Sequence, residues 1–208
     1  MSKNEEKKKG MNLPNKITCV RLVVSVLVLL LLCLPWEDMN VKFLIKSYSV
    51  YEVQNVQMKY IIAGVLFLIG SVTDFLDGYI ARKYNMVTDF GKVMDAIADK
   101  ILVNGVLILL AVNGYISAIV PVVIVCRDIA VDSIKMIAGQ KNGAVAASKA
   151  GKTKTAFMLT GITLVLFNDL PFSLFSVYPG KIIIMIAVVL SIISGIQYYE
   201  KNKKYIIN

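Results

Sequence analysis

The stretch that sets the fold of this chain is DFLDGYIARKYNMVTDFGKVMDAIAD, residues 74–99, in which four aspartates stand at the edges of two apolar runs. Asp74 and Asp77 are three residues apart, and Asp95 and Asp99 are four apart. Each offset places both carboxylates of a pair on one face of a helix. The connection between the pairs is short. The spacing therefore predicts two helices that pack antiparallel and bring the four carboxylates together.

These four carboxylates predict a site for a divalent cation. An ionised carboxylate in or beside a bilayer costs about 2.5 to 3.5 kcal/mol on insertion scales, and four together would also repel one another. Oxygen ligands suit hard cations such as Mg2+ or Mn2+, which also bridge phosphates. Ion pairing with nearby lysines and arginines is the alternative, but it does not account for four aspartates in one register.

Small residues accompany the aspartates. Gly78, Ala81 and Gly91 would let a bulky polar ligand approach the helix backbone, although small residues also suit helix packing. Arg82 follows Gly78 by one helical turn. We expect it to hold a phosphate, with extension of the side chain toward lipid headgroups as the alternative.

The composition is that of a membrane protein. The 208 residues are 57% hydrophobic, and the mean hydropathy is +0.67. The absence of histidine excludes catalysis through imidazole. Three isolated cysteines are interpreted as small buried apolar residues. The net charge of +9 is spread along the flanks of apolar segments, which argues against nucleic acid as a partner.

The predicted fold is all-α and polytopic, with six transmembrane helices after a short N-terminal amphipathic segment. A charged tail, residues 1–10, is expected to be disordered, and residues 11–208 form a single membrane domain. The connection 35–58 is expected to be an exposed loop with an interfacial segment near Trp36, Tyr48 and Tyr51. The six helices are predicted at 17–34, 59–81, 91–112, 116–138, 153–169 and 180–199.

The distribution of cations predicts the orientation. Of 23 lysines and arginines, only Lys42, Lys46, Lys59 and Lys181 fall on one side of the predicted spans. Cytoplasmic flanks carry the excess of positive charge. Both termini and the aspartates are therefore expected in the cytoplasm.

The register D-x2-D-G-x2-A-R-x8-G-x3-D-x3-D resembles the signature of the CDP-alcohol phosphatidyltransferases. Two further segments, NLPNKITCVR at 12–21 and CRDIAVDSIKMIAGQKNGAVAASKAGKTKT at 126–155, are similar to the bacterial members that make phosphatidylglycerol phosphate. The likeness thus covers most of the chain. Its fixed positions are Asp74, Asp77, Gly78, Ala81, Arg82, Gly91, Asp95 and Asp99.

The resemblance implies an enzyme of a bacterial plasma membrane that transfers a phosphatidyl group from CDP-diacylglycerol to glycerol 3-phosphate and releases CMP. It also implies a homodimer and assigns the role of base to Asp99, which would take the proton of the acceptor alcohol. The four aspartates would bind the metal. The residues expected to contact CDP-diacylglycerol are Asp77, Gly78, Ala81, Arg82 and Gly91.

The phosphate of such an acceptor requires a basic pocket. Arg127 and Lys135 are eight residues apart and share a helix face, and Lys152 and Lys154 begin a helix whose N-terminus favours anions. Together with Arg21 they are the predicted phosphate ligands. Ordinary positive flanking charge is the alternative interpretation for each.

The sequence leaves the acceptor open. Asp128 stands where related synthases usually have Glu, Asp132 stands where small or hydroxyl residues are common, and Ala96 replaces a frequent proline. Inositol phosphate, serine or phosphatidylglycerol are alternative acceptors. A cation transporter is a further alternative, but its acids should lie near the bilayer midplane between broken helices.

Overall fold

The computed structural model describes residues 13–50, 54–84, 88–140 and 149–206. Six long helices form within these ranges, close to the positions predicted from the sequence. They are α1 (Leu13–Cys33), α3 (Met58–Lys83), α4 (Asp89–Val112), α5 (Ile119–Gln140), α6 (Lys149–Leu166) and α7 (Pro179–Ile206). The tail 1–10 lies outside the described residues. Helix α1 is continuous from Leu13, so residues 13–16 are its first turn and no separate amphipathic segment precedes it there.

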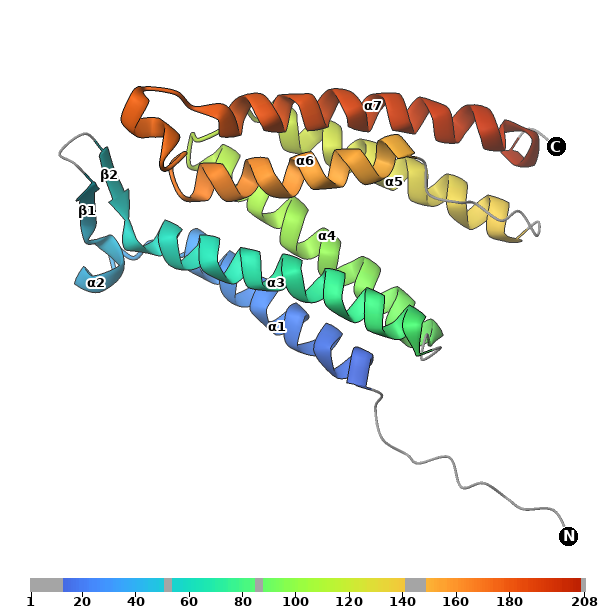
Figure 1. Ribbon diagram of the computed structural model, residues 1–208, viewed down its shortest axis with the longest axis horizontal. Coiled ribbons are helices and arrows are strands. Elements are labelled where there is room, and N and C mark those ends of the chain that lie inside the picture. Colours follow the sequence, from blue (N-terminus) through green and yellow to red (C-terminus); the bar gives the residue numbers. More distant parts are fainter. Residues whose placement is uncertain (1–12, 51–53, 85–87, 141–148, 207–208) are drawn as a thin grey trace, which may run out of the picture.

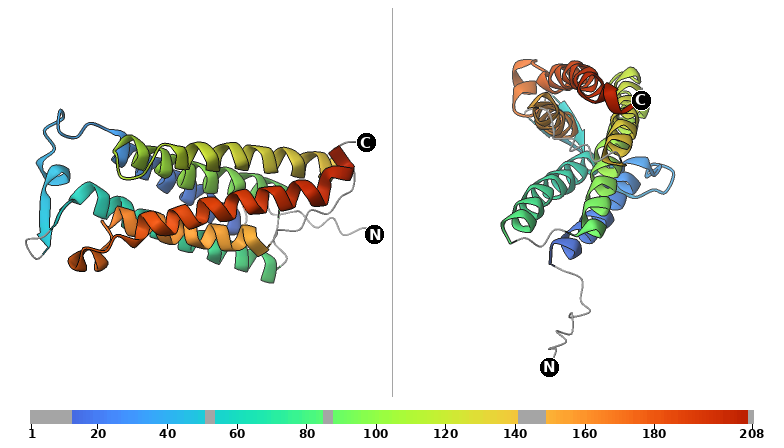
Figure 2. Two further views of the ribbon diagram at one scale, coloured as in Figure 1. Left: turned by 90° about the horizontal axis from the view of Figure 1, so that it is seen from above. Right: turned by 90° about the vertical axis from the view of Figure 1, so that its right-hand side faces the viewer.

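The helices form two groups of three (Figure 1). Helix α1 packs against α3 and α4, and α7 packs against α5 and α6. Contacts of α3 with α6 and of α4 with α5 join the groups. In Figure 1 the groups lie close together at one end and diverge toward the other, and the end-on view of Figure 2 also separates them.

One predicted contact is wrong. The two aspartate-bearing helices, α3 and α4, were expected to pack directly on each other, but they touch only slightly. Each packs mainly against α1 instead. The reason is that α1 offers a long apolar surface to both, and its Val28 and Leu32 lie in the common core.

Helix α4 has clear signals at both ends. Thr88 is its N-cap, and the Thr88 hydroxyl oxygen accepts a hydrogen bond of 3.0 Å from the Gly91 N–H. The helix ends at Val112, and Gly114 follows with a φ of +76°, a conformation that glycine adopts without strain. These signals set the register that carries Asp95 and Asp99.

The segment 35–58 is not simply a loop, as was predicted. It contains a short helix, α2 (Lys42–Ile45), and an antiparallel hairpin of β1 (Ser47–Val50) and β2 (Gln54–Gln57), with Ser47 opposite Gln57. Valine, tyrosine and serine alternate here, a composition that favours strands. The Trp36 indole N–H donates to the Leu31 carbonyl at 2.7 Å. Tyr51 lies outside the described residues.

The helices bury one side and expose the other. Phe67, Leu107 and Ile184 are at most 1% exposed, whereas Val112 is 76% exposed. Large exposed apolar side chains cover the outer faces, as a lipid-facing surface requires. Cys33 and Cys126 belong to that exposed surface, so the prediction that they are buried is wrong.

Three described helices are long and apolar enough to span a membrane by length and composition. The candidate spans are Asn15–Cys33 in α1, Met58–Leu76 in α3 and Pro179–Lys203 in α7. Helices α4, α5 and α6 carry the charged residues of the predicted site, which lowers their hydropathy. The chain is thus all-α with three helices that could span a membrane, and the other three spans and the membrane location stay predictions.

Candidate active site

A buried polar stripe runs along the N-terminal half of α1. Asn15, Thr18, Arg21 and Ser25 follow one another at offsets of three or four residues, which places them on one helix face. All four are at most 8% exposed. In a helix this apolar, a buried polar stripe needs polar partners, and α3 and α4 supply them.

Arg21 joins the first aspartate of α3 to the first aspartate of α4. Its Nη1 pairs with an Asp74 carboxylate oxygen. Its Nη2 donates to Asp95 Oδ1 at 2.9 Å and to the Asp95 carbonyl at 3.4 Å. Thr18 Oγ1 also donates to Asp95 Oδ1, at 2.7 Å. The Arg21 side chain is 1% exposed, while those of Asp74 and Asp95 are 45% and 40% exposed. The two carboxylates therefore keep an accessible side.

This position of Arg21 differs from the sequence prediction. Arg21 was expected to help bind the acceptor phosphate, but its guanidinium is engaged by Asp74 and Asp95. It shares a helix face with Thr18, and that face packs against α4. The sequence could not show this, because it does not reveal which neighbour a helix face meets.

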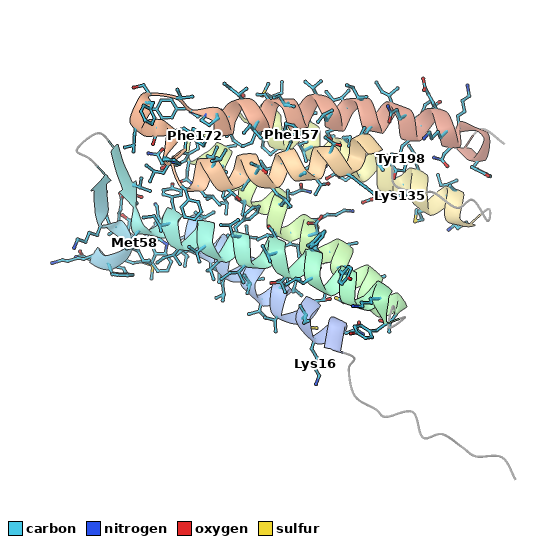
Figure 3. The ribbon with its side chains drawn as sticks, viewed as in Figure 1. Lys16, Met58, Lys135, Phe157, Phe172 and Tyr198 are labelled. Atoms are coloured by element: carbon cyan, nitrogen blue, oxygen red, sulfur yellow. The ribbon has the colours of Figure 1, made fainter. Side chains whose placement is uncertain are left out.

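The other four predicted phosphate ligands lie together around one cavity. The cavity is open on one side, has a volume of about 260 Å³ and is lined by residues of α4, α5, α6 and α7. In Figure 3, Lys135 and Tyr198 lie side by side in this region, with the Lys135 Nζ 5.6 Å from the centre of the Tyr198 ring. The charged residues that line the cavity are Asp99, Lys100, Arg127, Asp128, Asp132, Lys135, Lys152 and Lys154.

Acidic residues pair with the cations in the wall of the cavity. Asp128 Oδ1 lies 3.0 Å from both Arg127 Nη1 and Lys154 Nζ. Asp132 pairs with Lys100 of α4 and lies 3.6 Å from Lys135 Nζ. The two acids that left the acceptor open in the sequence thus hold basic side chains in place.

Two serines of α7 contribute to the site and were not predicted. The Arg127 Nε donates to the Ser191 carbonyl at 3.0 Å, and its Nη2 donates to Ser194 Oγ. Ser191 and Ser194 are both fully buried. Their signal in the sequence is a polar stripe, continued by Tyr198 and Asn202 at helical spacing within an otherwise apolar run.

Asp99 lies on α4 between the aspartate pair held by Arg21 and the basic cavity. It lines the cavity beside Lys154, and it lies within electrostatic range of Asp74 and Arg21 in the first group of helices. Asp128 and Lys154 of the second group also act on it. An acceptor held in the cavity would therefore lie next to a carboxylate and close to the Asp74 and Asp95 pair.

The donor set suits Mg2+ or Mn2+, which prefer oxygen ligands, because the carboxylates of Asp74 of α3 and Asp95 of α4 lie against the same guanidinium. Among the described side chains, no three acidic, cysteine or histidine residues stand close enough together to hold a metal ion. The side chains of Asp77, Ala81 and Arg82 lie outside the described residues. The metal thus stays a prediction that rests on the chemistry of the donors.

Gly91 has a packing role in the structure. A Cβ atom at this position would lie 2.7 Å from Asn15 Oδ1 of α1 and 3.1 Å from Thr88 Oγ1. Asn15 also accepts a hydrogen bond of 3.1 Å from Thr88. Gly78 lies in α3, beside the aspartates of that helix.

Comparison with known proteins agrees with the resemblance. Residues 11–193 match the CDP-alcohol phosphatidyltransferase family. A CDP-diacylglycerol–glycerol-3-phosphate 3-phosphatidyltransferase of Bacillus subtilis is 33% identical, covering 92% of this chain and 95% of its own length. Proteins of the same name from Mycoplasma genitalium and Rickettsia felis are 32% and 31% identical over 92% and 93% of this chain, and over 85% and 97% of their own lengths.

Proposed function

The chain belongs to the CDP-alcohol phosphatidyltransferase family, and we propose that it transfers the phosphatidyl group of CDP-diacylglycerol to glycerol 3-phosphate. The products are phosphatidylglycerol phosphate and CMP, which makes the protein an enzyme of phospholipid biosynthesis. The observation that carries the proposal is that Asp99, one helical turn after Asp95 on α4, lines a cavity that is also lined by lysines and Arg127.

The reaction is a substitution at phosphorus. The hydroxyl oxygen of glycerol 3-phosphate forms a bond to the phosphorus that carries diacylglycerol, and the bond from that phosphorus to the CMP oxygen breaks. CMP leaves with the electron pair. Asp99 accepts the proton that the hydroxyl loses. The position of Asp99 in the lining of the cavity supports this role.

The basic residues position the acceptor. Arg127, Lys135, Lys152 and Lys154 surround the cavity and offer charged N–H donors to the phosphate of glycerol 3-phosphate. Asp128 lies between Arg127 and Lys154 and keeps both directed at the same region. Orientation of this kind reduces the entropy that the reaction would otherwise lose in the transition state.

A divalent cation, Mg2+ or Mn2+, would be held by Asp74, Asp77, Asp95 and Asp99. When bound, it neutralises the pyrophosphate of CDP-diacylglycerol and the charge on the leaving CMP. In this proposal CDP-diacylglycerol also contacts the small and basic residues of the register, namely Gly78, Ala81, Arg82 and Gly91.

The proposal includes a location and an assembly. The enzyme crosses the plasma membrane of a bacterium several times, forms a homodimer, and holds the active site and both termini in the cytoplasm. The distribution of positive charge supports the orientation. The acyl chains of the substrate then stay in the bilayer while its cytidine lies at the cytoplasmic surface.

The test is an assay of CMP release by the purified protein in detergent. CDP-diacylglycerol is supplied with glycerol 3-phosphate, with and without Mg2+, and separately with inositol phosphate, serine and phosphatidylglycerol. We expect Mg2+-dependent CMP with glycerol 3-phosphate as the best acceptor. CMP with another acceptor alone would change the assigned substrate, and no CMP with any acceptor would refute the reaction.

A further inference from the structure

We propose that Arg21 is a positioning residue, which sets the separation of Asp74 and Asp95 and thereby shapes the metal site. This inference rests on the proposed function in one respect, namely that these two aspartates bind a divalent cation. It assigns to Arg21 a task different from binding the acceptor phosphate.

The packing of the helices is the first reason. Asp74 and Asp95 come from α3 and α4, which touch each other only slightly and pack mainly against α1. The contact between those two helices is therefore too small to fix the distance between their carboxylates. Arg21 of α1 bonds to both carboxylates at once.

The shape of the guanidinium is the second reason. Nη1 and Nη2 belong to one planar group, and each is directed at a different carboxylate. A planar fork fixes both distance and orientation, whereas a lysine ammonium is a point charge on a flexible stem. With a side chain only 1% exposed, Arg21 has little freedom to leave this arrangement.

The surroundings of Arg21 hold it in turn. Thr18 Oγ1 donates to the same Asp95 oxygen that Arg21 contacts. One turn nearer the N-terminus, Asn15 packs against Gly91 and accepts a hydrogen bond from Thr88 at the start of α4. Arg21, Thr18 and Asn15 therefore fix the position of α4 along α1 at three successive points.

The experiment measures the affinity for Mn2+, by electron paramagnetic resonance of free Mn2+, in the full-length protein in detergent. The variants are Arg21→Lys, which keeps the charge but loses the fork, and Thr18→Val, which keeps the volume but loses one hydrogen bond. Lys16→Met is the matched control, because Lys16 is an exposed cation on the outer side of α1, one turn from the site (Figure 3).

Residues that orient metal ligands change metal affinity by about 10- to 100-fold when they are replaced. We expect the Kd for Mn2+ to rise by that factor in Arg21→Lys, and by less in Thr18→Val. The kcat should fall in parallel, while the KM for glycerol 3-phosphate stays within about twofold of the wild-type value. Lys16→Met should match the wild type in all three quantities.

Several outcomes would overturn the inference. An unchanged Kd for Mn2+ with a raised KM for glycerol 3-phosphate in Arg21→Lys would make Arg21 a phosphate ligand. A wild-type Kd in Arg21→Lys would show that charge alone suffices. If Arg21→Lys does not fold, Thr18→Val decides, and a wild-type Kd in that variant counts against the inference.

A separate outcome concerns the proposed function. Wild-type protein that releases CMP without binding Mn2+ would show that there is no metal site, whatever the variants do.

Discussion

In the proposed reaction Asp99 is the base, and its side chain lines the cavity that would receive the acceptor. Replacing it by Asn keeps the size of the side chain but removes its capacity to accept a proton. General base catalysis contributes about 10²- to 10⁴-fold to a rate. We expect kcat for CMP release to fall by that factor in Asp99→Asn, with an unchanged elution profile on size exclusion.

The control for this substitution is Glu200→Gln, an exposed carboxylate of α7. It should retain wild-type turnover. A rate for Asp99→Asn within about threefold of the wild type would mean that another group accepts the proton.

Lys154 is the most buried cation of the cavity, at 9% exposure, and its Nζ is held 3.0 Å from Asp128. A hydrogen bond to a charged group contributes about 1.5 to 3 kcal/mol, so its loss should raise the KM for glycerol 3-phosphate about tenfold or more in Lys154→Met. Steady-state kinetics at saturating CDP-diacylglycerol measure this effect.

Lys203→Met, at an exposed position of α7, is the matched control and should leave the KM unchanged. Equal KM values for the two variants would show that the cavity does not receive the acceptor phosphate.

At the scale of elements, the contact of α1 with α4 depends on the absence of a side chain at residue 91. A methyl group in Gly91→Ala would lie 2.7 Å from Asn15 Oδ1. Such overpacking typically costs about 1 to 3 kcal/mol. We expect a lower Tm and a lower kcat in this variant, because the shift of α1 carries Arg21 with it.

Gly139→Ala is the matched control, since nothing lies within 4 Å of a Cβ at that helical position of α5. Alanine favours a helix over glycine, so the Tm should be unchanged or slightly higher. A lower Tm for Gly139→Ala than for Gly91→Ala would contradict this account.

A buried acid in the turn after α6 contacts the start of α7. Asp169 is 3% exposed, and its Oδ1 accepts a hydrogen bond of 2.6 Å from the Gly180 N–H. Burial raises the pKa of the Asp169 carboxyl above its ordinary value. The folded protein therefore binds this proton more tightly than the unfolded chain does, and the associated stability is lost as the pH rises through the raised pKa.

Asp169→Asn removes this titration while keeping the oxygen that caps the helix. The Tm of Asp169→Asn minus the Tm of the wild type should therefore increase as the pH rises from 4 to 7. Thermal melts at constant salt measure both values. A difference that shifts in the opposite direction would mean that the ionised form is the one stabilised by folding.

At the scale of the whole molecule, the two groups of helices come together at the hairpin end and diverge at the end that carries the site (Figure 1). The ends of the helices that carry most of the cations lie at the diverging end, which the proposal places in the cytoplasm. In a variant without Cys19, Cys33 and Cys126, a new cysteine at Lys42 should react with a membrane-impermeant maleimide in intact cells.

A cysteine at Lys203 is the control for this experiment. It should react only after the membrane is permeabilised, since the end of α7 is assigned to the cytoplasm. The reverse pattern would invert the orientation and place the site outside the cell.

Much of this architecture could be predicted because it is local. Apolar runs bounded by charges indicate helices directly, and the six long helices lie close to their predicted positions. The hairpin of β1 and β2 was missed because each strand is only four residues long and β2, QNVQ, has a single apolar residue, too few for a clear periodic signal. Of the five predicted phosphate ligands, Arg127, Lys135, Lys152 and Lys154 line one cavity and Arg21 does not, while phosphate binding itself stays a prediction.

By itself, the sequence determined the helices, the register of the four aspartates and the family, because each is a property of residues close together along the chain. Only the tertiary structure decided that α1 links α3 and α4, that Arg21 belongs to the aspartates, and that Ser191 and Ser194 hold Arg127. The physical reason is that a polar residue in an apolar helix must find a partner, and which partner it finds depends on how the helices pack.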